Sequence, residues 1–157
     1  MYIVCFFERN KPVSMIHPIV RRALASDLPG IWEVRYGVTE NTLPPGRISD
    51  EEVLESMQEK GCGWVVESEG RIAGFAIGIT DTGNVWALFV HPDFQGQGIG
   101  HALHEEMMRW FSTQAVNPVW LTTGTTTRAR AFYEAHGWIN CGPSGDREIR
   151  YERPNAS

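Results

Sequence analysis

The sequence has little that would suit a membrane protein, a nucleic-acid-binding protein or a metalloprotein. No apolar run approaches the length of a transmembrane helix. The net charge of −5 argues against non-specific binding to nucleic acid, which needs a basic surface. Cys5, Cys62 and Cys141 lack metal-type spacing, so free thiols in a reducing cytoplasm are the simplest interpretation. Residues 1–7 are apolar but lack a basic start and a cleavage site, which makes them a poor signal peptide.

The length and composition that remain are those of one ordinary globular domain. The chain has 157 residues, of which 42% are hydrophobic and 21% charged. Residues 1–14 look like an N-terminal extension to a single domain at 15–157. The sequence leaves two alternatives open, namely that Met15 is the natural start or that the first residues form an extra edge strand.

One stretch organises the chain: a strand, a glycine-rich loop and a helix. Val85–Val90 is a continuous apolar run of strand length, and Pro92 cannot continue a sheet ladder. Three alternating glycines follow, at Gly96, Gly98 and Gly100, and they lead directly into an amphipathic helix over residues 99–111. Glycine lets the backbone approach a ligand closely, and the first N–H groups of a helix favour phosphate. The stretch therefore predicts a cradle for a diphosphate.

Three known glycine-rich loops compete for this stretch. A Walker A loop needs a lysine that is absent here, and a dinucleotide fingerprint needs its third glycine one position later. What fits is Gln-x-x-Gly-x-Gly at Gln95, Gly98 and Gly100, after a strand that ends Val-x-Pro. This loop resembles the acyl-CoA loop of the GNAT superfamily of N-acetyltransferases. The competing interpretation is a glycine-rich turn without a ligand.

A second motif, residues 129–138, resembles the other signature of that family. Its pattern is Ala-x-x-Phe-Tyr followed by Gly-Trp. The resemblance implies that Tyr133 is a general acid near the thioester sulfur, and the alternative is an aromatic side chain that packs in the core, as we expect of Phe132. Three residues before Ala129 the family often has Asn, whereas this chain has Thr126. A threonine hydroxyl can still bond the pantetheine or cap the helix.

The resemblance implies an α+β fold, with a mixed, mostly antiparallel central sheet of six to seven strands flanked by about four helices. The patterns along the chain agree with it. We expect strands at residues 20–24, 64–68, 73–79, 85–90, 118–123, 138–141 and 148–153. We expect helices at residues 28–38, 50–60, 99–111 and 125–136, with caps at Ser26-Asp27 and Ser49 for the first two.

The resemblance also implies the co-substrate, acetyl-CoA, and the residues that bind it. Its pantetheine arm would lie along the strand at 85–90, in a slot made where this strand and the fifth separate, often at a bulge. Its diphosphate would lie on the loop. The implied residues are Leu88, Phe89, Val90, Gln95, Gly96, Gln97, Gly98, Ile99, Gly100, His101, Thr126 and Tyr133. We expect no metal: His101 and His104 have i, i+3 spacing, but no further ligand is placed beside them, so they are predicted to face solvent.

The acceptor is a small-molecule or peptide amine in this family, and the region after the first strand usually shapes its pocket. The candidates are Trp32, Arg35, Tyr36, Glu40 and Asn41, with core packing for Trp32 and solvated surface for the others as the alternative. The strand at 85–90 carries no Asp or Glu, so the base is ordered water, Glu33, Glu40 or Asp81.

The sequence thus predicts a cytoplasmic acetyltransferase that moves an acetyl group from acetyl-CoA to a primary amine by direct attack. The alternatives are a non-catalytic acyl-CoA-binding regulatory module, or an interaction domain that no longer binds CoA. Neither nucleic acid nor membrane is an expected partner. Dimers are frequent in the family, and a homodimer is left open.

Overall fold

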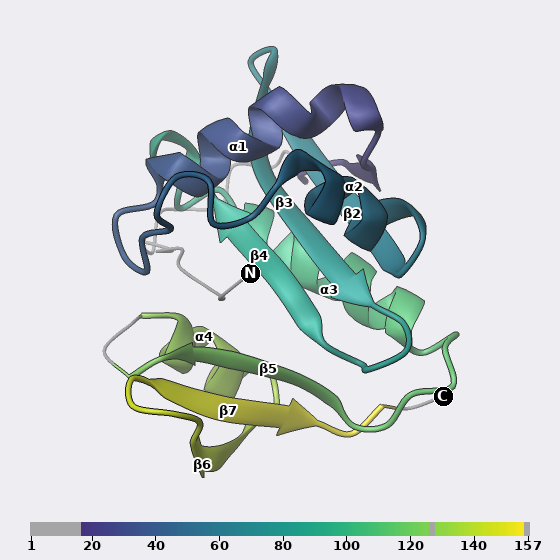
Figure 1. The fold of residues 1–157 in the computed structure, drawn as a ribbon, viewed down its shortest axis with the longest axis vertical. Coiled ribbons are helices and arrows are strands. Elements are labelled where there is room, and N and C mark those ends of the chain that lie inside the picture. Colours follow the sequence, from purple (N-terminus) through teal and green to yellow (C-terminus); the bar gives the residue numbers. More distant parts are fainter. Residues whose placement is uncertain (1–16, 126–127, 156–157) are drawn as a thin grey trace.

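Two antiparallel sheets, which meet at one point, form the framework of the protein (Figure 1). The computed structural model describes residues 17–125 and 128–155, and these contain seven strands. The first sheet has the order β1-β2-β3-β4, and the second has the order β5-β7-β6. The bounds are β1 Val20–Arg22, β2 Gly61–Ser68, β3 Arg71–Ile79, β4 Val85–Val90, β5 Val119–Gly124, β6 Ile139–Pro143 and β7 Glu148–Arg153.

Helices cover both faces of the first sheet. Helices α1 (Leu28–Gly37) and α2 (Asp50–Gln58) lie on one face, and α3 (Ile99–Phe111) lies on the other (Figure 1). Helix α4 (Ala129–Ala135) packs beside the second sheet. None of the described helices is long and apolar enough to cross a membrane.

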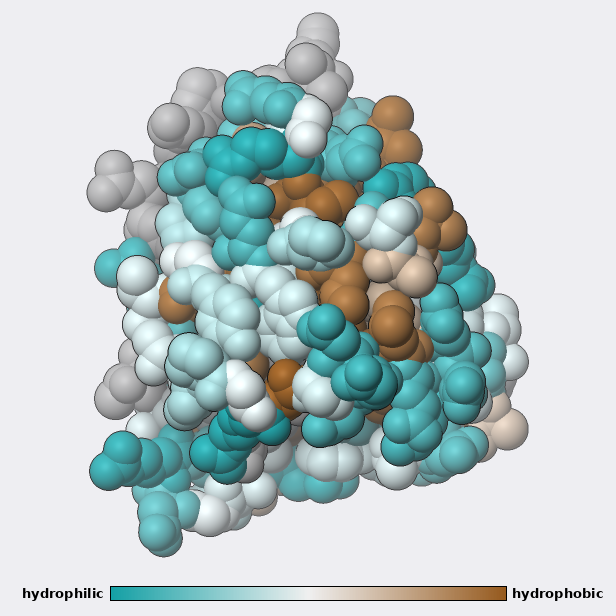
Figure 2. All heavy atoms as spheres, turned by 45° about the horizontal axis from the view of Figure 1, so that its top comes forward, coloured by the Kyte–Doolittle hydropathy of each residue, from teal (hydrophilic) through white to brown (hydrophobic). Residues whose placement is uncertain are grey.

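The alternation of side chains along the strands divides the core in two. Phe89 of β4 packs toward α1 and α2, while Leu88 and Val90 pack toward α3 and the second sheet. Both faces of β4 are therefore buried, as its continuous apolar run predicted. On the outside, hydrophilic side chains cover most of the face with α1 and α2, and apolar ones reach the surface in a group near its centre (Figure 2).

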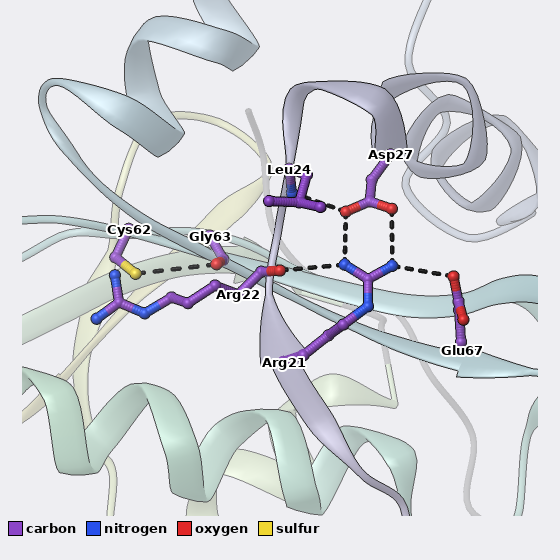
Figure 3. A network of polar contacts seen from close by, with 7 residues as sticks. All are labelled: Arg21, Arg22, Leu24, Asp27, Cys62, Gly63 and Glu67. Atoms are coloured by element: carbon purple, nitrogen blue, oxygen red, sulfur yellow. Dashed lines mark hydrogen bonds and ion pairs between the residues drawn. The ribbon is translucent and has the colours of Figure 1, made fainter.

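The two predicted helix caps have different outcomes. Ser49 caps α2 as predicted, because its hydroxyl accepts a hydrogen bond from the Glu52 amide at 3.1 Å. The cap predicted at Ser26-Asp27 is wrong in its chemistry, since Asp27 makes no side-chain bond to the start of α1. Its carboxylate instead accepts from the Leu24 amide, at 2.7 Å, in the turn before the helix (Figure 3).

The same carboxylate anchors the edge strand β1. The Arg21 guanidinium donates to both oxygens of Asp27, at 2.8 and 2.9 Å, and to Glu67 of β2 at 2.9 Å (Figure 3). The hydrogen bonds from Arg21 hold the pKa of the Asp27 carboxyl below its usual value. These side-chain bonds link the three-residue strand β1 both to the neighbouring strand β2 and to the turn before α1.

The α+β class and the order of elements are confirmed, with local differences. β4 and β7 have the predicted bounds, but β1 ends at Arg22 and α4 begins at Ala129. The predicted central sheet is divided into sheets of four and three strands. The proposed extension, residues 1–14, lies outside the described residues.

Candidate functional site

Strands β4 and β5 touch at one end and then separate. Asn84, directly before β4, forms an isolated parallel bridge with Trp120 of β5. The Trp120 amide donates to the Gly83 carbonyl and its indole N–H to the Thr82 carbonyl, both at 2.9 Å. Past this bridge the strands belong to different sheets, so no strand of the described chain pairs with the outer edge of β4. Backbone groups on such an edge can bond a ligand instead.

A β-bulge explains the separation. Ile77 of β3 faces Ala87, whereas the next residue, Gly78, faces Val85. Trp86 is therefore an extra residue in β4, and an extra residue bends the strand and increases its twist. The bend lies next to the Asn84 bridge, which is where β4 leaves β5.

The predicted cradle lies at the far end of β4. Gly96 and Gly98 in the glycine-rich loop (residues 95–101) have positive φ angles, 78° and 77°, and Gly98 is the N-cap of α3. The first helical bond runs from the Ala102 amide to the Gly98 carbonyl. No group in the described part of the chain accepts a hydrogen bond from the amides of residues 99–101. The first turn of α3 has no acidic side chain, so these amides and the helix dipole favour an anion.

The side chains of the predicted cofactor residues differ in exposure. Leu88, Phe89 and Val90 are buried, so these residues can offer a ligand only their backbone. Gln97 and His101 are exposed, Gln95 is partly buried, and Ile99 and Gly100 are buried in α3. Thr126 lies outside the described residues, and its contact with pantetheine stays a prediction.

Tyr133 lies in the core rather than on an open surface. Its side chain is fully buried, hydroxyl included, in the cluster that contains Val90 and Ile99. Tyr133 thus belongs to the same core cluster as the end of β4 and the start of α3. Phe132, which we expected in the core, is only partly buried and stacks on His136 with ring centroids 4.0 Å apart.

The prediction of two solvent-facing histidines is wrong for His104. It is 3% exposed, and its Nε2 accepts a hydrogen bond from the Trp138 indole at 3.0 Å. Burial, with smaller effects from nearby His136, Arg153 and His101, lowers the pKa of His104 to about 3. The spacing Gly100–His104–Met107–Phe111 places it on the buried face of α3, a signal that the sequence contained. No group of three or more His, Cys, Asp or Glu side chains among the described residues could hold a metal ion.

A polar pocket of about 490 Å³ lies between two connections that are far apart in sequence. One is the segment between α1 and α2, and the other is the β6–β7 hairpin. The lining residues are Asn41, Arg47, Gly124, Ser144, Gly145, Asp146, Arg147 and Glu148. Of the five predicted acceptor residues, Asn41 lines this pocket. The hairpin residues were not predicted individually, because their loop has no chemical motif.

The other four acceptor candidates do not line this pocket, and each has a partner elsewhere. Arg35 is 1% exposed, and its guanidinium lies 4.4 Å from the centroid of the Phe89 ring, so the solvated alternative is wrong. Trp32 is partly buried against the core cluster beneath α1 and α2, in line with its core-packing alternative. Its ring stacks on that of the exposed Tyr36, with centroids 5.3 Å apart, and its indole N–H donates to Asp50.

The candidate bases have partners of their own or lie at the wrong end of β4. Glu33 pairs with Arg71 at 2.9 Å, and Glu40 pairs with Arg128 of the α4 start at 3.7 Å. Asp81 lies in the β3–β4 turn, at the opposite end of β4 from the glycine-rich loop. None of these three carboxylates is free on the open edge of β4, and β4 itself carries no Asp or Glu.

Comparison with known families identifies one match. The family model described as acetyltransferase (GNAT) domain matches residues 34–149. Among curated proteins, the chain is 27% identical over 116 residues to the [ribosomal protein bS18]-alanine N-acetyltransferase of Salmonella typhimurium, covering 72% of this chain and 75% of that protein. It is 28% identical over 93 residues to the protein of the same name from Escherichia coli K12, covering 57% and 63%.

Solved structures share the fold. The ribosomal-protein-S18-alanine N-acetyltransferase from Escherichia coli superposes with a TM-score of 0.72 at 22% identity, covering 90% of this chain and 96% of that chain. The paia N-acetyltransferase from Thermoplasma acidophilum, solved in complex with coenzyme A, has a TM-score of 0.74 at 14% identity, covering 88% and 99%.

Proposed function

We propose that this chain, which belongs to the GNAT family of acetyltransferases, acetylates the N-terminal amine of a peptide or protein. The premise is that it is an acyl-CoA-dependent N-acetyltransferase. The observation that carries the proposal is the unpaired edge of β4, which leads directly into the glycine-rich loop. The pantetheine amides of acetyl-CoA would bond the backbone of residues 88–90 as an added strand does. The diphosphate would accept hydrogen bonds from the amides of residues 99–101.

The chemistry is a direct transfer. The neutral acceptor amine attacks the thioester carbonyl, a C–N bond forms, and the C–S bond breaks. The amine loses one proton, and the departing thiolate gains one. A thiol has a pKa of about 8.5, so proton donation by Tyr133 accelerates the last step without being obligatory.

The absence of a carboxylate on β4 favours an α-amine as the acceptor. A lysine side chain has a pKa of about 10.4, whereas an N-terminal amine has one of about 8. At neutral pH a far larger fraction of the α-amine is already unprotonated, so it needs less help from a base. The names of the two curated relatives, which state an alanine of a ribosomal protein, support the same class of acceptor.

The acceptor is proposed to enter through the polar pocket between the α1–α2 segment and the β6–β7 hairpin. Its lining carries charges of both signs, Arg47 and Arg147 beside Asp146 and Glu148. Such a lining suits the polar backbone of a peptide better than an apolar metabolite.

Thiol release from acetyl-CoA with three matched peptides tests the proposal. The first peptide begins with a free alanine, the second is the same peptide with its N-terminus blocked, and the third is blocked but contains one lysine. We expect turnover with the first only. Equal turnover of the lysine peptide would refute the preference for an α-amine. Tight binding of acetyl-CoA without turnover of any amine would favour the non-catalytic binding module.

The role of Tyr133 has its own test. We expect Tyr133→Phe to lower kcat by about tenfold to a hundredfold, because general acid catalysis typically contributes 10²–10⁴ and a thiolate departs partly unaided. The KM for acetyl-CoA should change little, since the hydroxyl acts on the leaving group. Unchanged turnover would remove Tyr133 from the chemistry. Steady-state kinetics with the alanine peptide provides the measurement.

A further inference from the structure

Helix α4, which carries Tyr133, is held against α3 by histidines. The helix has seven residues, too few to be stable without packing. His101 and His104 project from α3, and His136 is the C-cap residue of α4. The position of Tyr133 therefore depends on how these side chains meet.

The inner contact fixes the state of His104. An indole N–H can only donate, so the Nε2 of His104, which accepts from Trp138, carries no proton. The proton of the neutral ring is on Nδ1. Burial keeps the ring neutral, because the pKa of His104 is lowered to about 3. The acceptor for Trp138 is thus present throughout the physiological pH range.

The rings of His104 and Trp138 both pack against the Tyr133 ring. The ring centroid of Tyr133 lies 5.4 Å from that of Trp138 and 6.4 Å from that of His104. The Trp138 amide also donates to the Tyr133 carbonyl at 3.0 Å. On the other side, Phe132 lies edge-on to both Tyr133 and His104. A shift of His104 therefore reaches Tyr133 both directly and through Trp138.

An outer contact joins the same two helices. His136 Nδ1 lies 2.7 Å from the Phe132 carbonyl and must donate to it. His136 Nε2 lies 2.9 Å from His101 Nδ1, within hydrogen-bonding distance. This contact connects the end of α4 to His101, which is in the first turn of α3 and is the last residue of the glycine-rich loop. The inner and outer contacts together hold α4 against α3, whose first turn is part of the predicted acetyl-CoA site.

We propose that His104 is a positioning residue that holds the Tyr133 ring in one orientation, through its hydrogen bond with Trp138 and its ring contact. The inference rests on the proposed function, in which Tyr133 donates a proton to the departing thiolate. His104 itself touches no reacting atom.

Two substitutions separate the hydrogen bond from the packing. His104→Leu fills the same buried space with an apolar side chain and removes the hydrogen-bond acceptor for the Trp138 indole. His104→Gln keeps an acceptor oxygen near the position of Nε2. Met107→Ala is the matched control, because it removes buried volume from the same face of α3 one turn further on. All variants are assayed well below their melting temperatures.

We expect His104→Leu to lower kcat about tenfold, a partial loss of general acid catalysis. The KM for acetyl-CoA should stay within about twofold, because ground-state binding is not changed. His104→Gln should restore kcat, and Met107→Ala should keep it. In a Tyr133→Phe background, His104→Leu should cause no further loss. A wild-type kcat in His104→Leu, no rescue by Gln, or an equal loss in the Tyr133→Phe background would each overturn the inference.

A measurement that needs no turnover separates this inference from the proposed function. In protein labelled with 3-fluorotyrosine, the ¹⁹F resonance of Tyr133 is assigned by its loss in Tyr133→Phe. We expect His104→Leu to shift or broaden this resonance, and His104→Gln to leave it in place. An unchanged resonance in His104→Leu would overturn the inference. If the wild type acetylates no amine, or Tyr133→Phe keeps full activity, the proposed chemistry fails and the resonance alone decides the positioning role.

Discussion

At the scale of single residues, Gly98 of the glycine-rich loop combines a positive φ angle with the N-cap position of a helix. It caps α3 with a φ of 77°, a conformation that costs other residues about 1–2 kcal/mol. A Cβ added there would meet nothing within 4 Å, so the protein itself leaves that space open. A phosphate can approach the amides of α3 through this space.

We predict that Gly98→Glu abolishes measurable binding of acetyl-CoA, because a carboxylate in that space repels the diphosphate. The folded state should lose only about 1–2 kcal/mol, from backbone strain. Gly142→Glu is the matched control: Gly142 also has positive φ and open space around it, but it lies in β6. Calorimetric titration of both variants measures the effect. Retained binding in Gly98→Glu would contradict a phosphate site at this loop.

The buried His104 leads to a second prediction, which concerns how the free energy of unfolding depends on pH. Its pKa is about 3 in the folded protein, below the ordinary value of 6.5, so below pH 6.5 the unfolded chain binds a proton that the native state does not. The stability from a neutral His104 is complete above pH 6.5 and is lost as pH falls toward 3. The wild type should lose up to about 1.4 kcal/mol more per pH unit than His104→Gln in this window.

Urea denaturation of both proteins at pH 7, 6 and 5 tests this sign. Other titrating groups are common to both proteins and cancel in the difference. Parallel curves for the two proteins would contradict a buried neutral His104.

Residues that belong to a motif were predictable from the sequence, and residues whose role depends on the tertiary environment were not. The glycine-rich loop is local, so its spacing alone placed Gly98 at a helix start. Burial of Arg35 against Phe89 required knowledge of how α1 crosses the sheet. The bond between His104 and Trp138 joins residues 34 positions apart, and no local pattern specifies it.

At the scale of elements, the edge strand β1 depends on one network of charges. β1 has three residues, too few to hold an edge by strand pairing alone. Its Arg21 bonds Asp27, whose side chain is 8% exposed, and Glu67, whose side chain is 57% exposed. The buried partner should matter more, because water screens the exposed one.

We therefore expect Asp27→Ala to lower the free energy of unfolding by about 1–3 kcal/mol, through the lost bonds to Arg21 and to the Leu24 amide. Glu67→Gln, the control, should cost much less. Thermal and chemical denaturation give both values. An equal loss in the two variants would show that burial does not decide how much each ion pair of Arg21 contributes to the free energy of unfolding.

Elements with strong patterns were predictable, and their association was less so. The apolar run of β4 set its ends correctly, and the bounds expected for β7 also agree with the structure. The family resemblance implied that β4 and β5 separate, often at a bulge. The position of the bulge, at Trp86, is specified by pairing with β3 and left no mark on the β4 sequence itself.

At the scale of the whole molecule, acetyl-CoA would contact β4, α3 and α4, which belong to both halves of the structure. A ligand that binds only the folded state stabilises it by about 2.7 kcal/mol at 100 times its dissociation constant. For a domain of this size we expect a rise in melting temperature of roughly 5–10 °C. Gly98→Glu should show no rise. No shift in the wild type at high acetyl-CoA would favour a domain that no longer binds CoA.

The most direct test is a crystal structure of the protein with acetyl-CoA. The diphosphate should lie within hydrogen-bonding distance, about 3 Å, of the amides that begin α3, with the pantetheine along the outer edge of β4. A nucleotide bound elsewhere, with residues 95–101 unoccupied, would contradict the assignment of this site.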